Sequence, residues 1–174
     1  MKKKELLHLA RTSIKNHLQK KRGIPFSPES PGLLLERGAF VTLKKDGVLR
    51  GCIGYPSPVA PLYQTIIQAS ISAAVKDTRF DPVTAAELRK INIEIAVLSP
   101  LQKIKNPMLI EVGKHGLFIS MGSQSGFLLP QVPVQNNWTI LTFLEQACIK
   151  AGLPKDAWKS GAELFIFTTN IFHE

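Results

Sequence analysis

Alternation of apolar and other residues is clearest at residues 91–98, where branched apolar side chains occupy every second position. A period of two is typical of a β-strand with one buried face. Two further apolar runs, 39–43 and 49–54, flank the turn-forming residues 45–47, which predicts a β-hairpin. Other strands are expected at residues 117–121, 127–132 and 164–169.

Apolar residues at intervals of three or four predict the helices. Residues 3–22 carry a single apolar stripe, whereas residues 62–76 are apolar around much of their surface, which predicts a largely buried helix. A third helix is expected at residues 139–151, with Cys148 on its apolar stripe and therefore in the core. A capping-box pattern at residues 84–87 predicts the start of a short further helix.

These elements do not follow the regular strand–helix–strand alternation of a parallel sheet, so the expected fold class is α+β. We expect residues 1–174 to form one domain with two unequal lobes. The larger lobe is expected to contain residues 1–100 and 155–174. The smaller lobe, residues 101–154, is expected to be inserted into it.

Composition is typical of a globular domain with a core of its own. The chain has 174 residues, of which 44% are hydrophobic, and a chain of this length buries roughly 70% of its unfolded surface. Cys52 and Cys148 are its two cysteines, which argues against a disulfide scaffold or a structural zinc site and favours a cytoplasmic location. No run of about 18 apolar residues occurs, so no membrane span is expected. The sequence has no H-E-x-x-H pattern and no dinucleotide fingerprint, so no metal or cofactor is expected.

Positive charge is concentrated at the start of the chain. The formal net charge is +9, and residues 1–22 contribute +7 of it, from eight Lys and Arg against the single acid Glu5. A solvated helix face is the preferred interpretation. RNA binding through this basic helix is the alternative, although a phosphate-tracking groove usually needs a basic stripe across the fold.

Candidate chemistry lies in the hexapeptide Leu49-Arg50-Gly51-Cys52-Ile53-Gly54. On a regular strand Arg50 and Cys52 share a face, and a neighbouring cation favours the reactive thiolate. Gly51 and Gly54 would let a ligand or another backbone approach closely. The alternative is that Cys52 is a small buried hydrophobic residue.

The hexapeptide and five other segments resemble the AMMECR domain family. These segments are Gly38–Leu43, Asp77–Pro82, Gly113–Leu117, Leu129–Val132, and Lys150–Leu153 with Trp158. The resemblance implies two unequal lobes, each with an antiparallel sheet, and a cleft between them that the hexapeptide faces. The resemblance supports an expected fold more firmly than it supports an expected activity.

Two site hypotheses follow. In the enzyme hypothesis Cys52 is a nucleophile beside Arg50, His115 is its general base, and Asp77 or Gln131 orients a partner group. The substrate-binding residues are then expected to be Arg50, Gly51, Gly54, Arg79 and Gln131. Simpler roles stay open: Arg79 could pair with Asp77 or cap the preceding helix, His115 could be a surface turn residue, and Gln131 could bond to a loop backbone.

The predicted function is that of an enzyme, or an enzyme partner, in modifying a macromolecule such as an RNA base or protein side chain, or an aromatic metabolite. The alternative is a non-catalytic binding module in which Arg50 anchors an anionic or carbonyl group. The resemblance implies protein partners for such a module, namely a Memo-like relative of aromatic-ring dioxygenases and a radical S-adenosylmethionine enzyme. RNA binding through the N-terminal helix is the third hypothesis.

Overall fold

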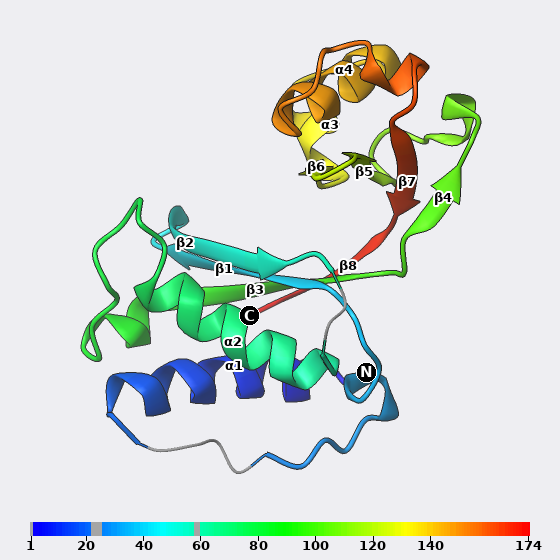
Figure 1. The fold of residues 1–174 in the computed structure, drawn as a ribbon. Coiled ribbons are helices and arrows are strands. Elements are labelled where there is room, and N and C mark those ends of the chain that lie inside the picture. The colour runs from blue at the N-terminus through cyan, green and yellow to red at the C-terminus, as the bar shows by residue number, and fades with distance from the viewer. Residues whose placement is uncertain (1, 22–25, 58–59) are drawn as a thin grey trace. The chain divides into compact units, whose positions relative to one another are not determined.

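The chain forms two compact α+β units in a computed structural model that describes residues 2–21, 26–57 and 60–174 (Figure 1). The first unit contains Met1–Leu98 and Asn170–Glu174, and the second contains Ser99–Thr169. Each unit has its own antiparallel sheet and its own hydrophobic core. The predicted α+β fold class is confirmed.

The sheet of the first unit has the strand order β2-β1-β3-β8. Its strands are β1 (Ala39–Lys45), β2 (Val48–Tyr55), β3 (Ile91–Leu98) and β8 (Thr169–His173). The predicted hairpin is present as β1 and β2. Its turn residues Asp46 and Gly47 have φ angles of 51° and 80°, and positive φ at both central positions is typical of the type I′ turns that join twisted strands.

Two helices cover one face of this sheet (Figure 1). They are α1 (Lys3–Leu18) and α2 (Leu62–Val75), and their apolar residues pack against those of β1 and β3 in one core. Short 3₁₀ helices occur at Pro31–Leu33 and Glu87–Lys90. The predicted first helix ends four residues early, because Lys20 adopts a φ of 55°. Gly23 and Pro25, residue types that commonly end a helix, follow in the sequence but lie outside the described residues.

The sheet of the second unit has the strand order β4-β7-β5-β6. Its strands are β4 (Gln102–Ile104), β5 (Gly116–Met121), β6 (Gln124–Leu128) and β7 (Glu163–Phe167). Its helices are α3 (Gln131–Gln135) and α4 (Ile140–Lys150), with 3₁₀ helices at Pro107–Leu109 and Ala157–Lys159. The Thr139 hydroxyl caps α4 by accepting the Thr142 backbone N–H at 3.2 Å. Cys148 is fully buried in the core of this unit, as predicted.

The structure differs from the predicted organisation where the chain returns to the first unit. The pattern predicts one strand at residues 164–169, but two strands, β7 and β8, occupy this region and belong to different sheets. Because β7 pairs with β4 and β5, residues 155–169 lie in the second unit and not in the larger lobe. The predicted strand 127–132 also stops at Leu128, and α3 follows.

Among the described residues, no helix has the length and apolar character needed to cross a membrane.

Candidate functional site

A β-bulge in β2 determines the geometry of the candidate hexapeptide. Leu43 pairs with Gly51 and Lys44 pairs with Leu49, so Arg50 is the extra residue without a cross-strand position. A bulge of this kind re-aims the side chains on both sides of it. The regular alternation that places Arg50 and Cys52 on one face therefore does not apply.

The bulge also decides which face of the sheet carries Cys52. With the bulge, Val41 pairs with Ile53 and Thr42 pairs with Cys52. Val41 is fully buried against the helices, whereas Thr42 is partly exposed. Cross-strand partners point to the same face, so Cys52 lies on the face away from the helices. A bulge-free pairing from the same turn would place Cys52 opposite Val41 and direct its thiol into the core.

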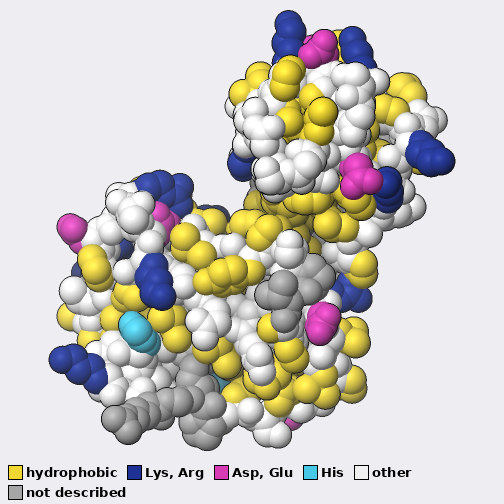
Figure 2. Space-filling view, viewed as in Figure 1, with side chains coloured by type: hydrophobic (Ala, Val, Ile, Leu, Met, Phe, Trp, Pro, Cys, Tyr) yellow, Lys and Arg dark blue, Asp and Glu magenta, His cyan; other side chains and the backbone are white. Residues whose placement is uncertain are grey.

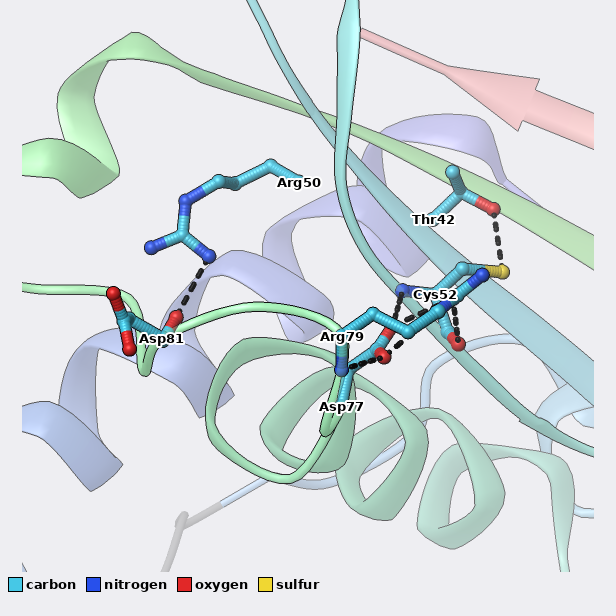
Figure 3. Close-up of polar contacts among 6 residues, drawn as sticks. All are labelled: Thr42, Arg50, Cys52, Asp77, Arg79 and Asp81. Carbon is cyan, nitrogen blue, oxygen red and sulfur yellow. Dashed lines mark hydrogen bonds and ion pairs between the residues drawn. The ribbon is translucent and has the colours of Figure 1, made fainter.

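The Arg50 side chain points away from Cys52 and towards Asp81 (Figure 3), and it forms an ion pair with Glu87. Its Nε and Nη2 donate to the Glu87 carboxylate at 2.9 and 3.1 Å, and its Nη1 donates to the Asp81 carbonyl at 2.8 Å. Lys45 also donates to Glu87, at 2.9 Å. These hydrogen bonds, that from Arg50 above all, lower the pKa of Glu87 to about 2. Arg50 is therefore not the cation that the sequence predicts beside the Cys52 thiol.

Asp77 lies just after α2 and joins that helix to the outer edge of β2. Its side chain is buried, and its carboxylate accepts four hydrogen bonds. Oδ2 accepts the backbone N–H of Cys52 at 2.8 Å and Nη2 of Arg79 at 2.7 Å. Oδ1 accepts Nε and the backbone N–H of Arg79 at 2.9 and 3.2 Å. An ionised carboxylate has about four acceptor positions, so these donors saturate Asp77.

Arg79 forms a bidentate pair with Asp77, which was one of the roles left open by the sequence (Figure 3). The hydrogen bond from Arg79 is the largest cause that holds the pKa of the Asp77 carboxyl well below its usual range, and Asp77 in turn raises the pKa of Arg79. The Arg79 side chain is nevertheless 56% exposed. Its Nη2 also reaches the Cys52 carbonyl at 3.4 Å, and its guanidinium lies 5.5 Å from the centre of the Phe80 ring.

Together these contacts cap the open edge of β2 at Cys52. β2 is the outermost strand of its sheet, and both outward-facing backbone groups of Cys52 are bonded, the N–H to Asp77 and the carbonyl to Arg79. The two side chains thus replace a neighbouring strand at this position. The geometry assigns Asp77 and Arg79 to holding the Cys52 backbone in place.

The Cys52 thiol itself lies beside a hydroxyl. Its Sγ is 3.3 Å from Oγ1 of Thr42 on the neighbouring strand, and the residue is partly exposed. Cys148 differs because it is completely buried, and burial raises the pKa of its thiol. Cys52 is therefore the accessible cysteine of the two.

Both glycines of the hexapeptide have close neighbours within the chain. A Cβ atom on Gly51 would lie 2.1 Å from the Ala73 carbonyl oxygen of α2, and one on Gly54 would lie 2.2 Å from the Phe40 ring. Real Cβ contacts are never this short, so only glycine fits at either position. Packing inside the first unit accounts for both glycines. At Gly51 the close neighbour is another backbone, which was one of the two alternatives that the sequence left open.

His115 and Gln131 belong to the second unit. Nδ1 of His115 accepts the Glu111 backbone N–H at 3.1 Å within a tight turn, so in the neutral ring the proton lies on Nε2. Gln131 is the first residue of α3 and does not lie at a strand end. The structure brings Cys52, Asp77 and Arg79 together in the first unit. The convergence of His115 and Gln131 with them stays a prediction.

Sequence reasoning missed two residues of this site. Glu87 belongs to the capping-box pattern, and its backbone N–H is 3.3 Å from the Thr84 hydroxyl, but its carboxylate pairs with Arg50 instead of capping. Thr42 could be found only from the register of the hairpin, which depends on the bulge. Within residues 2–21, 26–57 and 60–174, no group of three or more His, Cys, Asp or Glu side chains is arranged to hold a metal ion.

Similar proteins identify the family. The family described as AMMECR1 matches residues 7–172. Protein MK0488 of Methanopyrus kandleri is 44% identical over 97% of this chain and 86% of its own length. A protein of Aquifex aeolicus is 41% identical over 98% of this chain and 92% of its own length.

A crystal structure shows the same fold. It is that of an uncharacterized protein, PH0010 from Pyrococcus horikoshii, with a TM-score of 0.87 and 41% identity over 97% of this chain and 89% of that one. The resemblance drawn from the sequence segments is thereby confirmed, and the chain belongs to the AMMECR1 family.

Proposed function

We propose that this protein is a non-catalytic binding module whose ligand site is the capped edge of β2 around Cys52 and Arg79. The observation that carries the proposal is the saturation of Asp77, whose carboxylate already accepts four hydrogen bonds. In the enzyme hypothesis Asp77 orients a partner group, and for that role it needs a free acceptor position. Asp77 has none to offer, and the geometry therefore favours binding over thiol catalysis.

The state of His115 supports the same conclusion. Its Nδ1 accepts a backbone N–H, so the neutral ring presents an N–H donor at Nε2 and not a base. To remove a proton from Cys52, the ring would have to give up its bond to Glu111.

Arg79 is the group that we assign to ligand recognition. Nε and Nη2 are occupied by Asp77 and Cys52, but Nη1 makes no hydrogen bond within the described part of the chain, so its two N–H donors are available to a ligand. Because Asp77 neutralises the charge of Arg79, an oxygen acceptor such as an amide, a nucleobase carbonyl or a carboxylate suits these donors. The ligand classes inferred from the sequence, a macromolecule or an aromatic metabolite, carry such groups.

The module would present this group to a modifying enzyme. The candidate partners are those that the family resemblance implies, a Memo-like protein and a radical S-adenosylmethionine enzyme. RNA binding through α1 has less support. Arg11 pairs with Glu174 and Lys2 with Glu29, and the Lys and Arg side chains on the one face that Figure 2 draws are scattered.

The test is rescue of a gene-deletion strain by variants of the chain. We expect Cys52→Ala to rescue, because the thiol is not required, and Arg79→Gln to fail. Since Arg79→Gln also leaves the buried Asp77 carboxylate unpaired, the double variant Asp77→Asn/Arg79→Gln is needed as well. We expect it to fold, by circular dichroism, and still to fail. Lys76→Gln is the matched control, because it removes an exposed cation close to the site.

The opposite pattern would support an enzyme. If folded Cys52→Ala and Cys52→Ser both fail while the double variant rescues, the binding proposal is wrong. An acyl or glycosyl adduct on Cys52, detected by mass spectrometry of protein recovered from cells, would contradict it independently.

A further inference from the structure

A second candidate site in the first unit lies beside the segment that contains Glu87, the ion-pair partner of Arg50. A groove of about 630 Å³ runs between the C-terminal half of α1 and the segment at residues 84–90. Its lining includes Lys15, Leu18, Ala85, Ala86, Leu88 and Arg89. This volume lies within the range of about 300–1,000 Å³ that is typical of small-molecule sites.

The two walls of the groove are joined by Arg11. From α1 its Nη1 donates to the Leu88 carbonyl at 3.0 Å and its Nη2 to the Ile91 carbonyl at 2.6 Å. Its Nε also donates to the Glu174 carboxylate at 2.8 Å. These bonds fix the spacing of the walls, and the carboxylate neutralises Arg11. The groove is therefore preformed. Because Arg11 is neutralised, any positive charge that the groove offers to a ligand must come from other lining residues.

Lys15 and Arg89 supply that charge. Both side chains are exposed, and neither makes a hydrogen bond or ion pair with any residue that the structure describes. Glu87, the acid nearest to Arg89 in the sequence, is already engaged by Arg50 and Lys45. The lining thus combines two unmatched cations with the apolar side chains of Leu18, Leu88 and the two alanines. Such a surface complements a molecule with an apolar body and an anionic end.

We propose that this groove binds an amphipathic anion, with its carboxylate or phosphate against Lys15 and Arg89 and its apolar body against Leu18 and Leu88. The site shares no residue with the capped edge of β2. It is independent of the function proposed above, and either can fail alone.

Two fluorescent probes that differ in charge test the proposal with the full chain. The probe 8-anilinonaphthalene-1-sulfonate carries one sulfonate, and N-phenyl-1-naphthylamine has the same aromatic body without it. We expect the anionic probe to bind more tightly than the neutral one. The double variant Lys15→Gln/Arg89→Gln should raise the Kd of the anionic probe about tenfold, equivalent to about 1.4 kcal/mol, and leave that of the neutral probe unchanged.

Two further variants locate the binding. Ala86→Trp, at an exposed position in the lining, should block both probes by filling the groove. The charge-matched control is Lys150→Gln/Lys155→Gln, which removes two exposed cations from the second unit and should leave both Kd values unchanged. Equal affinities for the two probes would overturn the proposal. It would also be overturned if the Kd of the anionic probe did not change in the Lys15/Arg89 double variant or in Ala86→Trp.

Displacement of the anionic probe identifies the anion. Decanoate and decyl phosphate have the same chain length, and decanol is their neutral counterpart. Displacement by decanoate assigns a carboxylate ligand, and displacement by decyl phosphate alone assigns a phosphate ligand. If decanol displaces the probe as well as either anion does, or if none of the three displaces it, the proposal is wrong.

Discussion

At the scale of single residues, two carboxylates with little solvent exposure, Glu87 and Asp77, hold arginine side chains in place. Glu87 holds Arg50 and Lys45, and Asp77 holds Arg79 together with the Cys52 backbone. Both carboxyl groups have lowered pKa values, because these donors stabilise the ionised form. A carboxyl group whose pKa is lower in the folded than in the unfolded chain stabilises the fold only while it is ionised.

For Glu87, this dependence of stability on pH falls in a range of pH that can be measured. Its pKa is about 2 in the folded chain against an ordinary 4.5. Its contribution to the free energy of unfolding is therefore complete above pH 4.5 and is lost as the pH falls towards 2. The size is about 3 kcal/mol, from 1.36 kcal/mol per pKa unit. We expect Glu87→Gln to lower stability at pH 7 and to reduce the loss between pH 5 and 2, measured by urea unfolding.

The matched control is Glu94→Gln, which breaks a more exposed ion pair with Lys44 on the same sheet. Exposed pairs contribute about 0–1 kcal/mol, so its unfolding curves should stay close to those of the parent chain. Parallel pH profiles for Glu87→Gln and the parent would contradict the assignment.

At the scale of elements, the bulge in β2 determines what the hexapeptide does. The same turn with and without the extra residue Arg50 would present opposite faces of β2 to the helices. In the observed register Gly51 packs against α2, and Cys52 is directed to the other face. The bulge is therefore the feature that keeps a thiol out of the core.

Gly51→Ala tests the contact that this register requires. The added methyl group would lie 2.1 Å from the Ala73 carbonyl oxygen, which is backbone and cannot rotate away. We expect the free energy of unfolding to fall by about 2 kcal/mol or more, as in other overpacked cores. Gly122→Ala is the control, because its Cβ would meet nothing within 4 Å and only its φ of +60° opposes the change. Equal losses for the two variants in thermal unfolding would show that α2 is not the constraint.

Local pattern was sufficient for the hairpin and for most of the elements, but not for the register between them. The turn at Asp46 and Gly47 and the alternation in β3 are properties of neighbouring residues, so the sequence predicts them directly. The position of the bulge depends on which residues of β1 can be buried opposite β2. The thiol's partner, Thr42, and the carboxylate that pairs with Arg50 therefore could not be found.

The break between β7 and β8 was missed for a related reason. Residues 164–167 are apolar, and the two threonines that follow them, Thr168 and Thr169, also favour strands, so the local pattern shows no break. Only long-range pairing reveals the change. The Thr168 carbonyl accepts the Ser99 N–H at 2.9 Å, and the Thr168 N–H donates to the Ser99 hydroxyl at 2.9 Å. Pairing between distant segments is not encoded in the local period.

At the scale of the whole molecule, the chain has two separate cores. The buried residues of the first unit come from α1, α2, β1 and β3, and those of the second from β5, β7 and α4 with their connections. Each core has apolar side chains that are fully buried, such as Leu9 in the first and Phe143 in the second. A cavity in one core should therefore weaken the unit that contains it.

Phe143→Ala tests this independence. Removing a fully buried phenyl ring costs about 3–5 kcal/mol. We expect hydrogen exchange to become faster throughout residues 99–169, while the amides of β1 and β3 keep their protection. Leu9→Ala should give the reverse pattern. If Phe143→Ala accelerates exchange equally in both units, they unfold as one cooperative structure and the prediction is wrong.

The division of the first unit into two sequence segments has a consequence for synthesis. A growing chain folds from its N-terminus as residues emerge, but the first unit includes Asn170–Glu174. The ribosome makes every residue of the second unit before it makes these. Until then Arg11 lacks its Glu174 partner, and β3 lacks β8 beside it. The unit that begins the chain is therefore the last to be completed, and its open edge at β3 is exposed to chaperones or other strands during that interval.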